Sequence, residues 1–139
     1  DALHVARANA AGVGRNAVGA RFGRGSWYEA LPEDLRGSLD AIVSNPPYIA
    51  TGDPLVGDSV LNWEPHDALF AGADGLNDLR VVVSGASNWL VPGGLLAVEM
   101  GFTQATVVSQ MFESAGFKNV SVHKDLAGLD RFVTGTSPR

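Results

Sequence analysis

The chain has 139 residues, 45% of them apolar, with a formal net charge of −5 and a pI near 5.0. This length and composition predict one domain with an ordinary hydrophobic core. The acidic balance argues against a nucleic-acid partner, because such surfaces are usually basic. The lack of cysteine excludes disulfides and thiolate metal sites, and no run approaches the roughly 18–20 apolar residues of a membrane helix. We expect a cytoplasmic protein with no membrane partner.

The first half of the chain is poor in regular periodicity. Apolar residues at helical spacing predict a helix over 1–11, ended by the glycines that follow it. Alternation predicts a strand over 18–22, and a polar connection then precedes a buried strand, Leu39–Ser44. Residues 49–76 form a long connection rich in Gly, Pro and Asp, a length that is usually functional or mobile.

The second half is strongly patterned. The predicted elements are a helix over 79–90 ended by a tight turn at 92–94, a strand over 95–100, a helix over 103–115, and two strands around 120–122 and 131–133 that should pair antiparallel. Alternating helices and strands predict an α/β fold. The sheet should be mostly parallel, with an antiparallel pair of strands at the carboxyl terminus.

Four consecutive residues, Asn45-Pro46-Pro47-Tyr48, follow the strand over 39–44. Two prolines cannot continue a strand, so the chain must leave the sheet there as a stiff, extended loop. This loop lies at the carboxyl end of a strand, where open α/β sheets bind ligands. The four residues therefore predict a binding site.

The chemistry of these residues suits a planar amide or amine. Both N–H groups of a primary amide can be held by two acceptors, the side-chain oxygen of Asn45 and the backbone carbonyl of Pro46, which directs the nitrogen lone pair toward an electrophile. Proline fixes its own backbone and so aims that carbonyl reliably. Tyr48 offers a flat face for stacking. We predict Asn45 and Pro46 as catalytic residues, and Pro47 and Tyr48 with them as substrate-binding residues.

Further segments make a resemblance to one family specific. They are Ala6-Arg7-Ala8-Asn9-Ala10, Gly25-Ser26-Trp27-Tyr28, Ile42–Ile49 with the four residues above, Glu64-Pro65, Ala73-Asp74-Gly75-Leu76, Pro92-Gly93-Gly94 and Asp125-Leu126-Ala127-Gly128. In this order along the chain, they resemble the HemK/PrmC family of methyltransferases, which modify a glutamine of peptide chain release factors. The resemblance implies a Rossmann-like class I methyltransferase fold, S-adenosylmethionine as methyl donor, and a release factor as protein substrate.

The resemblance also implies cofactor contacts. It gives Trp27 a place beside the adenine and Asn45 a role shared between cofactor and substrate. Ser26 stands where many members of the family carry Asp, so it can bond an adenine amine but supplies no charge. No metal is expected, because the three histidines are scattered through different elements.

A cofactor-binding segment is missing from the sequence. The family carries an acidic, glycine-rich segment after its first strand, and no such Gly-x-Gly-x-Gly follows a strand here. We therefore expect residues 1–139 to be the carboxyl-terminal portion of a catalytic domain whose first two strands lie outside this chain. The chain alone should bind S-adenosylmethionine poorly and be inactive.

The sequence is compatible with other functions and leaves the roles of some residues open. The same four-residue core occurs in enzymes that methylate the exocyclic amine of adenine in RNA or DNA, and an inactive truncated remnant is a third possibility. Glu64 is read as a loop residue rather than an acid–base catalyst. Glu99 either lines the site or anchors structure, and the neighbours Asp130 and Arg131 are read as a surface ion pair.

Overall fold

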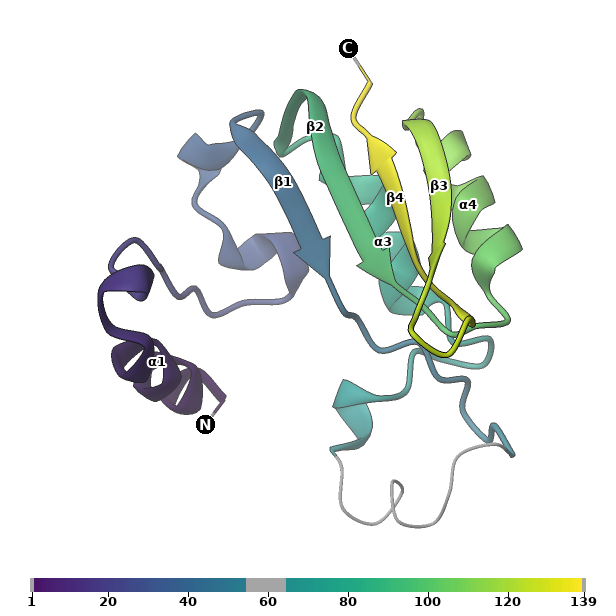
Figure 1. Ribbon diagram of the computed structural model, residues 1–139, viewed down its shortest axis with the longest axis horizontal. Helices are drawn as coiled ribbons and strands as arrows, with labels where there is room; N and C mark the ends of the chain where they lie inside the picture. The colour runs from purple at the N-terminus through teal and green to yellow at the C-terminus, as the bar shows by residue number, and fades with distance from the viewer. Residues whose placement is uncertain (1, 55–64, 139) are drawn as a thin grey trace. The chain divides into compact units, whose positions relative to one another are not determined.

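The computed structural model describes residues 2–54 and 65–138 (Figure 1). Two compact units make up the chain, residues 1–33 and 34–139. The second unit holds the sheet and the four-residue loop. Among the described residues, no helix is long and apolar enough to cross a membrane.

A four-stranded mixed sheet forms the frame of the second unit. Its strands are β1 (Leu39–Ser44), β2 (Leu90–Glu99), β3 (Lys118–Lys124) and β4 (Asp130–Thr136), in the spatial order β1-β2-β4-β3. β1 and β2 run parallel, whereas the β2–β4 and β3–β4 pairs are antiparallel. The predicted α/β class and the antiparallel pair at the carboxyl terminus are confirmed.

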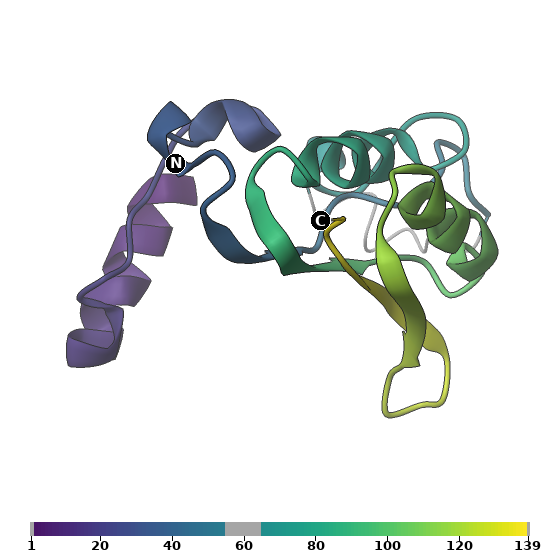
Figure 2. The same cartoon turned by 90° about the horizontal axis from the view of Figure 1, so that it is seen from above.

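Two helices cover one face of this sheet, as Figures 1 and 2 show. They are α3 (Asn77–Ala86), which buries an apolar stripe at i, i+3, i+4 spacing, and α4 (Ala105–Ser114), which buries Val108 and Phe112 at i, i+4. Together with the inward residues of the strands they form the core. Its fully buried side chains include Leu79, Val82, Val83, Leu96, Val98, Met100, Val108, Phe112 and Val133.

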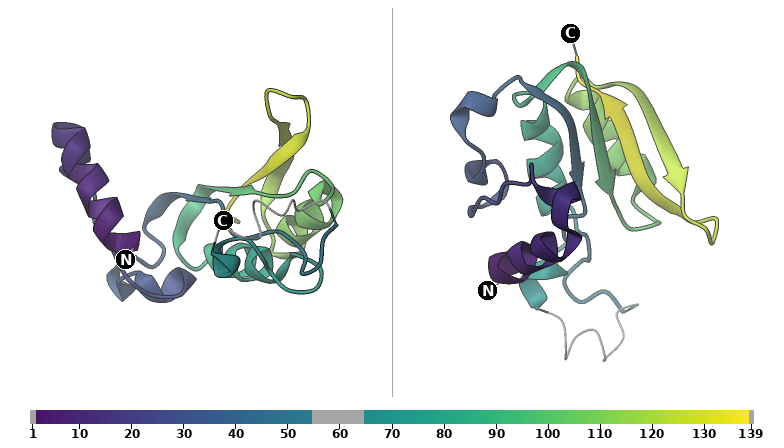
Figure 3. Two further views of the ribbon diagram at one scale, coloured as in Figure 1. Left: turned by 90° about the horizontal axis from the view of Figure 1, so that it is seen from below. Right: turned by 60° about the vertical axis from the view of Figure 1, so that its left-hand side comes forward.

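The opposite face of the sheet is open within this unit. Figure 3 shows both helices on one side and the β3–β4 hairpin extending from the sheet. Val43 on β1 is 79% exposed, and no β1 residue is fully buried. The predicted strand is present, but the prediction that it is buried is wrong. Within the described residues, β1 pairs only with β2 and is covered on one side.

The first unit has helical but no strand structure in its described residues. It contains α1 (Ala2–Val13) and the 3₁₀ turns Gly14–Ala17 and Trp27–Ala30. The strand predicted over 18–22 is wrong: these residues are turn and irregular backbone, and Val18 is 83% exposed. A strand needs a hydrogen-bonded neighbour, and this unit offers none.

The junction between α3 and β2 also differs from the prediction. The helix ends at Ala86, and Leu90 already pairs with Leu39 in the sheet. The tight turn predicted at 92–94 lies inside β2, where the register jumps from Leu90 to Leu95 and Gly93 has a φ of 78°. These residues therefore bulge out of a strand rather than separate a helix from one.

Candidate functional site

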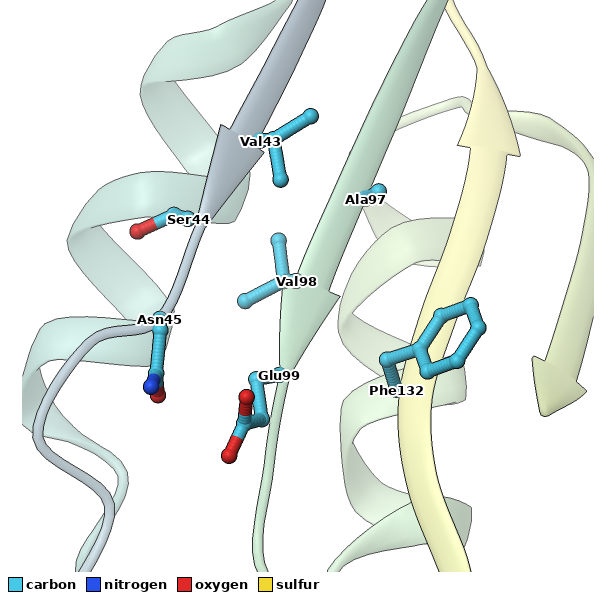
Figure 4. Close-up of a pocket in the computed structure, with 7 residues that line it drawn as sticks. All are labelled: Val43, Ser44, Asn45, Ala97, Val98, Glu99 and Phe132. Atoms are coloured by element: carbon cyan, nitrogen blue, oxygen red, sulfur yellow. The ribbon is translucent and has the colours of Figure 1, made fainter. Parts of the chain in front are cut away.

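The site lies at the carboxyl ends of β1 and β2, which meet at one edge because the two strands are parallel. The chain leaves β1 at Asn45. Ser44 pairs with Val98, so the residues that follow them, Asn45 and Glu99, lie at the same edge of the sheet at the ends of neighbouring strands. Figure 4 shows the Asn45 amide and the Glu99 carboxylate at the ends of these neighbouring strands.

A cavity of about 300 Å³ opens on the uncovered face beside these two side chains. Its lining is mostly apolar, with Ser44, Asn45 and Glu99 as the polar side chains at the strand ends (Figure 4). The lining residues are Val43, Ser44, Asn45, Ala97, Val98, Glu99 and Phe132. A mostly apolar hollow with few polar groups is the usual character of a small-molecule or side-chain site.

The two predicted acceptors are not used within the described part of the chain. Asn45 is exposed, whereas Pro46 is fully buried. Among the residues that the structure describes, none donates a hydrogen bond to the Asn45 side chain or to the Pro46 carbonyl. The Asn45 side chain is therefore accessible to a ligand, and Pro46 is in reach only through the hollow that it lines. A second hollow of about 140 Å³ is lined by Asn45, Pro46, Pro47 and Tyr48 together with Ile49, Ala68 and Leu69.

Tyr48 is tied into a polar network. Its hydroxyl donates to the Glu99 carboxylate at 3.0 Å. Burial, with the Glu99 carboxylate as the second cause, raises the pKa of Tyr48, and the nearby Arg131 guanidinium opposes the rise. The phenol is therefore a neutral donor at ordinary pH. Glu99 accordingly does both things considered for it, lining the cavity and anchoring Tyr48.

Arg131 is held by the loop between β3 and β4. Asp125 accepts two hydrogen bonds from the Arg131 guanidinium, at 3.1 and 3.2 Å. It accepts two more from the backbone N–H groups of Ala127 and Leu129. The expected pairing of Arg131 with Asp130 is wrong, because Asp130 bonds Lys124 instead. Alternation explains this: neighbouring residues of β4 point to opposite faces of the sheet.

Gln104 is the functional residue that the sequence did not reveal. It precedes α4, and its side-chain amide donates to the carbonyls of Tyr48 and Gly75, at 3.0 and 3.3 Å. Its oxygen accepts from the N–H of Gly101 at 2.9 Å. One side chain thus joins the four-residue loop, the turn before α3 and the loop after β2. Its partners are 56 and 29 residues distant, so no local pattern could have indicated it.

The turn before α3 fits closely against the four-residue loop. Gly75 has a φ of 70°, and a Cβ there would lie 2.9 Å from the Ala50 nitrogen. Asp74 accepts from the Leu76 N–H at 3.1 Å and forms an ion pair with Arg80 at 2.6 Å. The family-like segment 73–76 is therefore structural, a turn that supports the loop.

The predicted cofactor residues Ser26 and Trp27 belong to the first unit. Ser26 is exposed and extended, and it precedes the 3₁₀ turn that Trp27 begins. Trp27 is half-buried with a φ of 46°, a left-handed conformation that costs about 1–2 kcal/mol for a residue with a side chain. A Cβ on Gly25 would lie 2.7 Å from the Ala30 nitrogen, so glycine is required for this turn.

Two further predictions from the sequence concern Glu64 and metal binding. Glu64 lies outside the described residues. Within residues 2–54 and 65–138, no group of three or more His, Asp or Glu side chains could hold a metal ion.

Comparisons with known proteins agree with the resemblance seen in the motifs. A release factor glutamine methyltransferase of Xylella fastidiosa (strain Temecula1) is 43% identical over 137 residues, which is 99% of this chain and 48% of that protein. One of Francisella tularensis subsp. tularensis is 40% identical over 129 residues, 93% of this chain and 44% of that protein. The chain thus spans about half the length of the curated relatives it matches. No family model matches it.

Among solved structures, a crystal structure of a protein-(glutamine-N5) methyltransferase (release factor-specific) from Alicyclobacillus acidocaldarius is 30% identical. That match covers 72% of this chain and 49% of the other, with a TM-score of 0.45. The sequence matches confirm the resemblance.

Proposed function

We propose that this chain is the carboxyl-terminal portion of the catalytic domain of a protein-(glutamine-N5) methyltransferase that modifies a peptide chain release factor. The observation that carries the proposal is the exposed Asn45 side chain at the carboxyl end of β1, next to the Pro46 carbonyl, with no described residue donating to either acceptor. The identity of about 40% to release factor glutamine methyltransferases supports the choice of glutamine. A translation factor as substrate implies a cytoplasmic reaction.

The site acts by holding an amide in one orientation. A glutamine amide nitrogen is a poor nucleophile because its lone pair is delocalised into the carbonyl. With one N–H donated to the Asn45 oxygen and the other to the Pro46 carbonyl, the remaining direction at nitrogen faces the electrophile. Holding the reacting groups in this orientation lowers the activation barrier, because the entropy cost of aligning them is met when the substrate binds. Effective molarities of about 10⁵ M or more are known for well-oriented reactions.

Three described residues are candidates for contacts with S-adenosylmethionine, one in the second unit and two in the first. Asn45 offers an open polar group beside the mostly apolar 300 Å³ cavity, and Trp27 offers a half-buried ring for a flat base. Ser26 is exposed and can bond an adenine amine. When bound, the cofactor would supply the methyl group. We propose Asn45, Trp27 and Ser26 as its contacts in this chain, with the remaining contacts supplied by a longer parent protein.

If the cofactor contacts are divided between this chain and the rest of the parent protein, the chain alone should bind the cofactor weakly. Calorimetric titration of the 139-residue chain with S-adenosylmethionine should give no measurable heat at micromolar concentrations. The parent protein should bind in that range. Micromolar affinity of the isolated chain would contradict the proposed division.

The activity is tested with the parent protein, labelled S-adenosylmethionine, and either a release factor or nucleic acid. Label should enter the release factor and be lost when its Gly-Gly-Gln glutamine is changed. Label in adenine would replace this proposal with the adenine-amine alternative. Label in neither would favour the inactive remnant.

Asn45→Ala tests the acceptor directly, with Asn88→Ala as the matched control. Asn88 is exposed and lies between α3 and β2, and only its backbone groups are bonded. Asn45→Ala should abolish labelling while leaving the circular dichroism spectrum unchanged, and Asn88→Ala should label like the wild type. Near-normal turnover of Asn45→Ala would refute the acceptor role.

A further inference from the structure

The proposed reaction leaves a proton that neither acceptor can take. The Asn45 amide oxygen and the Pro46 carbonyl are neutral oxygens that accept hydrogen bonds but are not bases at ordinary pH. A methylated amide nitrogen that still carries both hydrogens is positively charged. The site therefore needs a group that stabilises this charge and accepts the proton.

Glu99 is the ionisable side chain among the residues that line the 300 Å³ cavity. It ends β2, the parallel neighbour of the strand that leads into Asn45, and its side chain shares the uncovered face with Val43 and Ala97. Figure 4 shows its carboxylate at the same edge as the Asn45 amide. The fold thus places a carboxylate in the same cavity as the side chain proposed to hold the amide.

Within the described residues, one oxygen of the Glu99 carboxylate is hydrogen-bonded and the other is not. Its Oε1 accepts the hydrogen bond from the Tyr48 hydroxyl at 3.0 Å, while no described residue donates to Oε2. Tyr48 is itself fixed at its carbonyl by Gln104. One oxygen of Glu99 is therefore positioned and the other is open toward the cavity.

We propose that Glu99 is a catalytic residue, the acceptor of the proton released when the glutamine amide is methylated; this inference rests on the proposed function. The amide nitrogen forms a bond to the methyl carbon as the carbon–sulfur bond breaks, with its electron pair left on sulfur. The nitrogen, now positively charged and tetrahedral, turns one N–H from its neutral acceptor toward the open oxygen of Glu99 and releases that proton to it. The products are a neutral N-methyl amide, a neutral thioether and a protonated carboxyl, which returns its proton to water.

The first test compares Glu99→Gln with Glu113→Gln in the parent protein. Glu113 is exposed on α4, so its variant is a control for loss of one negative charge. With a Gly-Gly-Gln peptide as substrate, Glu99→Gln should lower kcat by about 100-fold or more, the usual range for a positioned proton acceptor. The KM for the peptide should change by less than about threefold, because the neutral amide is held by Asn45 and Pro46. Glu99→Asp should recover part of the loss.

The second test measures binding without turnover. In a Gly-Gly-ornithine peptide, an ammonium group takes the place of the amide nitrogen on a side chain of the same length. Calorimetry should show that Glu99→Gln weakens this peptide about tenfold or more, as expected for a lost hydrogen bond to a charged group. Its affinity for the Gly-Gly-Gln peptide should stay within about threefold of wild type, and Glu113→Gln should leave both affinities unchanged.

Each pattern of results decides the question. Loss of kcat together with selective loss of ornithine binding supports the proposal. Normal turnover of Glu99→Gln overturns it, and so does a loss of kcat with ornithine binding intact, which would mean that Glu99 only supports Tyr48. If the wild-type parent fails to methylate the glutamine peptide, the proposed function itself is wrong, an outcome that is distinct from a variant behaving like an active wild type.

Discussion

Removal of the Gln104 side chain should destabilise the four-residue loop and the unit that carries it. Gln104→Ala deletes three hydrogen bonds, to the Tyr48 and Gly75 carbonyls and from the Gly101 N–H. At about 0.5–1.5 kcal/mol net for each bond, the expected loss is roughly 1.5–4.5 kcal/mol of unfolding free energy. The three backbone partners are part-buried, so water replaces the lost bonds incompletely and the central value of about 3 kcal/mol is expected.

Urea denaturation of the 139-residue chain measures this loss. With a urea m-value of about 2 kcal/mol/M, a loss of 3 kcal/mol moves the midpoint down by about 1.5 M. Gln110→Ala is the matched control, since Gln110 is an exposed glutamine of α4. It should raise stability slightly, by a few tenths of a kcal/mol, because alanine is the better helix former.

A local readout separates loop loosening from a general effect. The Gly101 amide should exchange with solvent much faster in Gln104→Ala, because its acceptor is gone, while the Val108 amide within α4 keeps its carbonyl partner. A midpoint within about 0.2 M of the Gln110→Ala variant, together with unchanged exchange at Gly101, would refute the idea that one side chain fixes the loop.

Three further predictions concern packing and titration. Gly135→Ala should lower the unfolding free energy by about 1–3 kcal/mol in urea melts, since its Cβ would lie 2.8 Å from a ring carbon of the buried Phe112; an unchanged melt would show that the ring can move away. Hydrogen bonds from backbone N–H groups, and after them the neighbouring arginine, hold the pKa of Asp125 below 3.8. The contribution of Asp125 to stability is therefore present above about pH 4 and is lost as pH falls through the lowered pKa. Wild type and Asp125→Asn should converge in stability in acid, and a constant difference down to about pH 2 would contradict this. Burial raises the pKa of Tyr28 to about 12 and also raises that of Tyr48, so an ultraviolet titration of the folded chain should show both phenols ionising at higher pH than free tyrosine. Stability should fall above pH 10, where the unfolded phenols ionise first, and a titration like that of free tyrosine would contradict this.

The regular elements of the second unit were predictable because their local patterns and their tertiary environment agree. The stripe of Leu79, Val82, Val83 and Ala86 is buried as its spacing predicts. The same reasoning extended the helix too far, since Leu90 continues the helical phase but is taken into β2. Helical spacing alone cannot show where the chain leaves the helix and enters the sheet.

The failures share a physical cause, which is that strand structure and burial depend on neighbours distant in the sequence. Residues 18–22 alternate as a strand should, yet without a pairing partner their backbone groups are turn and irregular. Val43 lies in a strand whose sequence predicts burial, yet its face has no cover within its unit. The Asn45–Tyr48 loop was predictable because proline restricts the backbone locally, wherever the neighbours lie.

Contacts within the second unit order the loop, whereas the face beside it stays uncovered within that unit. Gln104 bonds the Tyr48 carbonyl, a bridge joins Ile49 to Phe70, and the Tyr48 hydroxyl bonds Glu99. Val43, Ala97 and the Glu99 carboxylate face the open side. The loop geometry proposed to hold a glutamine amide therefore rests on contacts within the second unit, whereas the proposed cofactor site is expected to need contacts from a longer parent protein. For this reason, loss of cofactor binding in the isolated chain should leave exchange protection at the Ile49 amide, which bonds the Leu69 carbonyl, as high as in the parent protein.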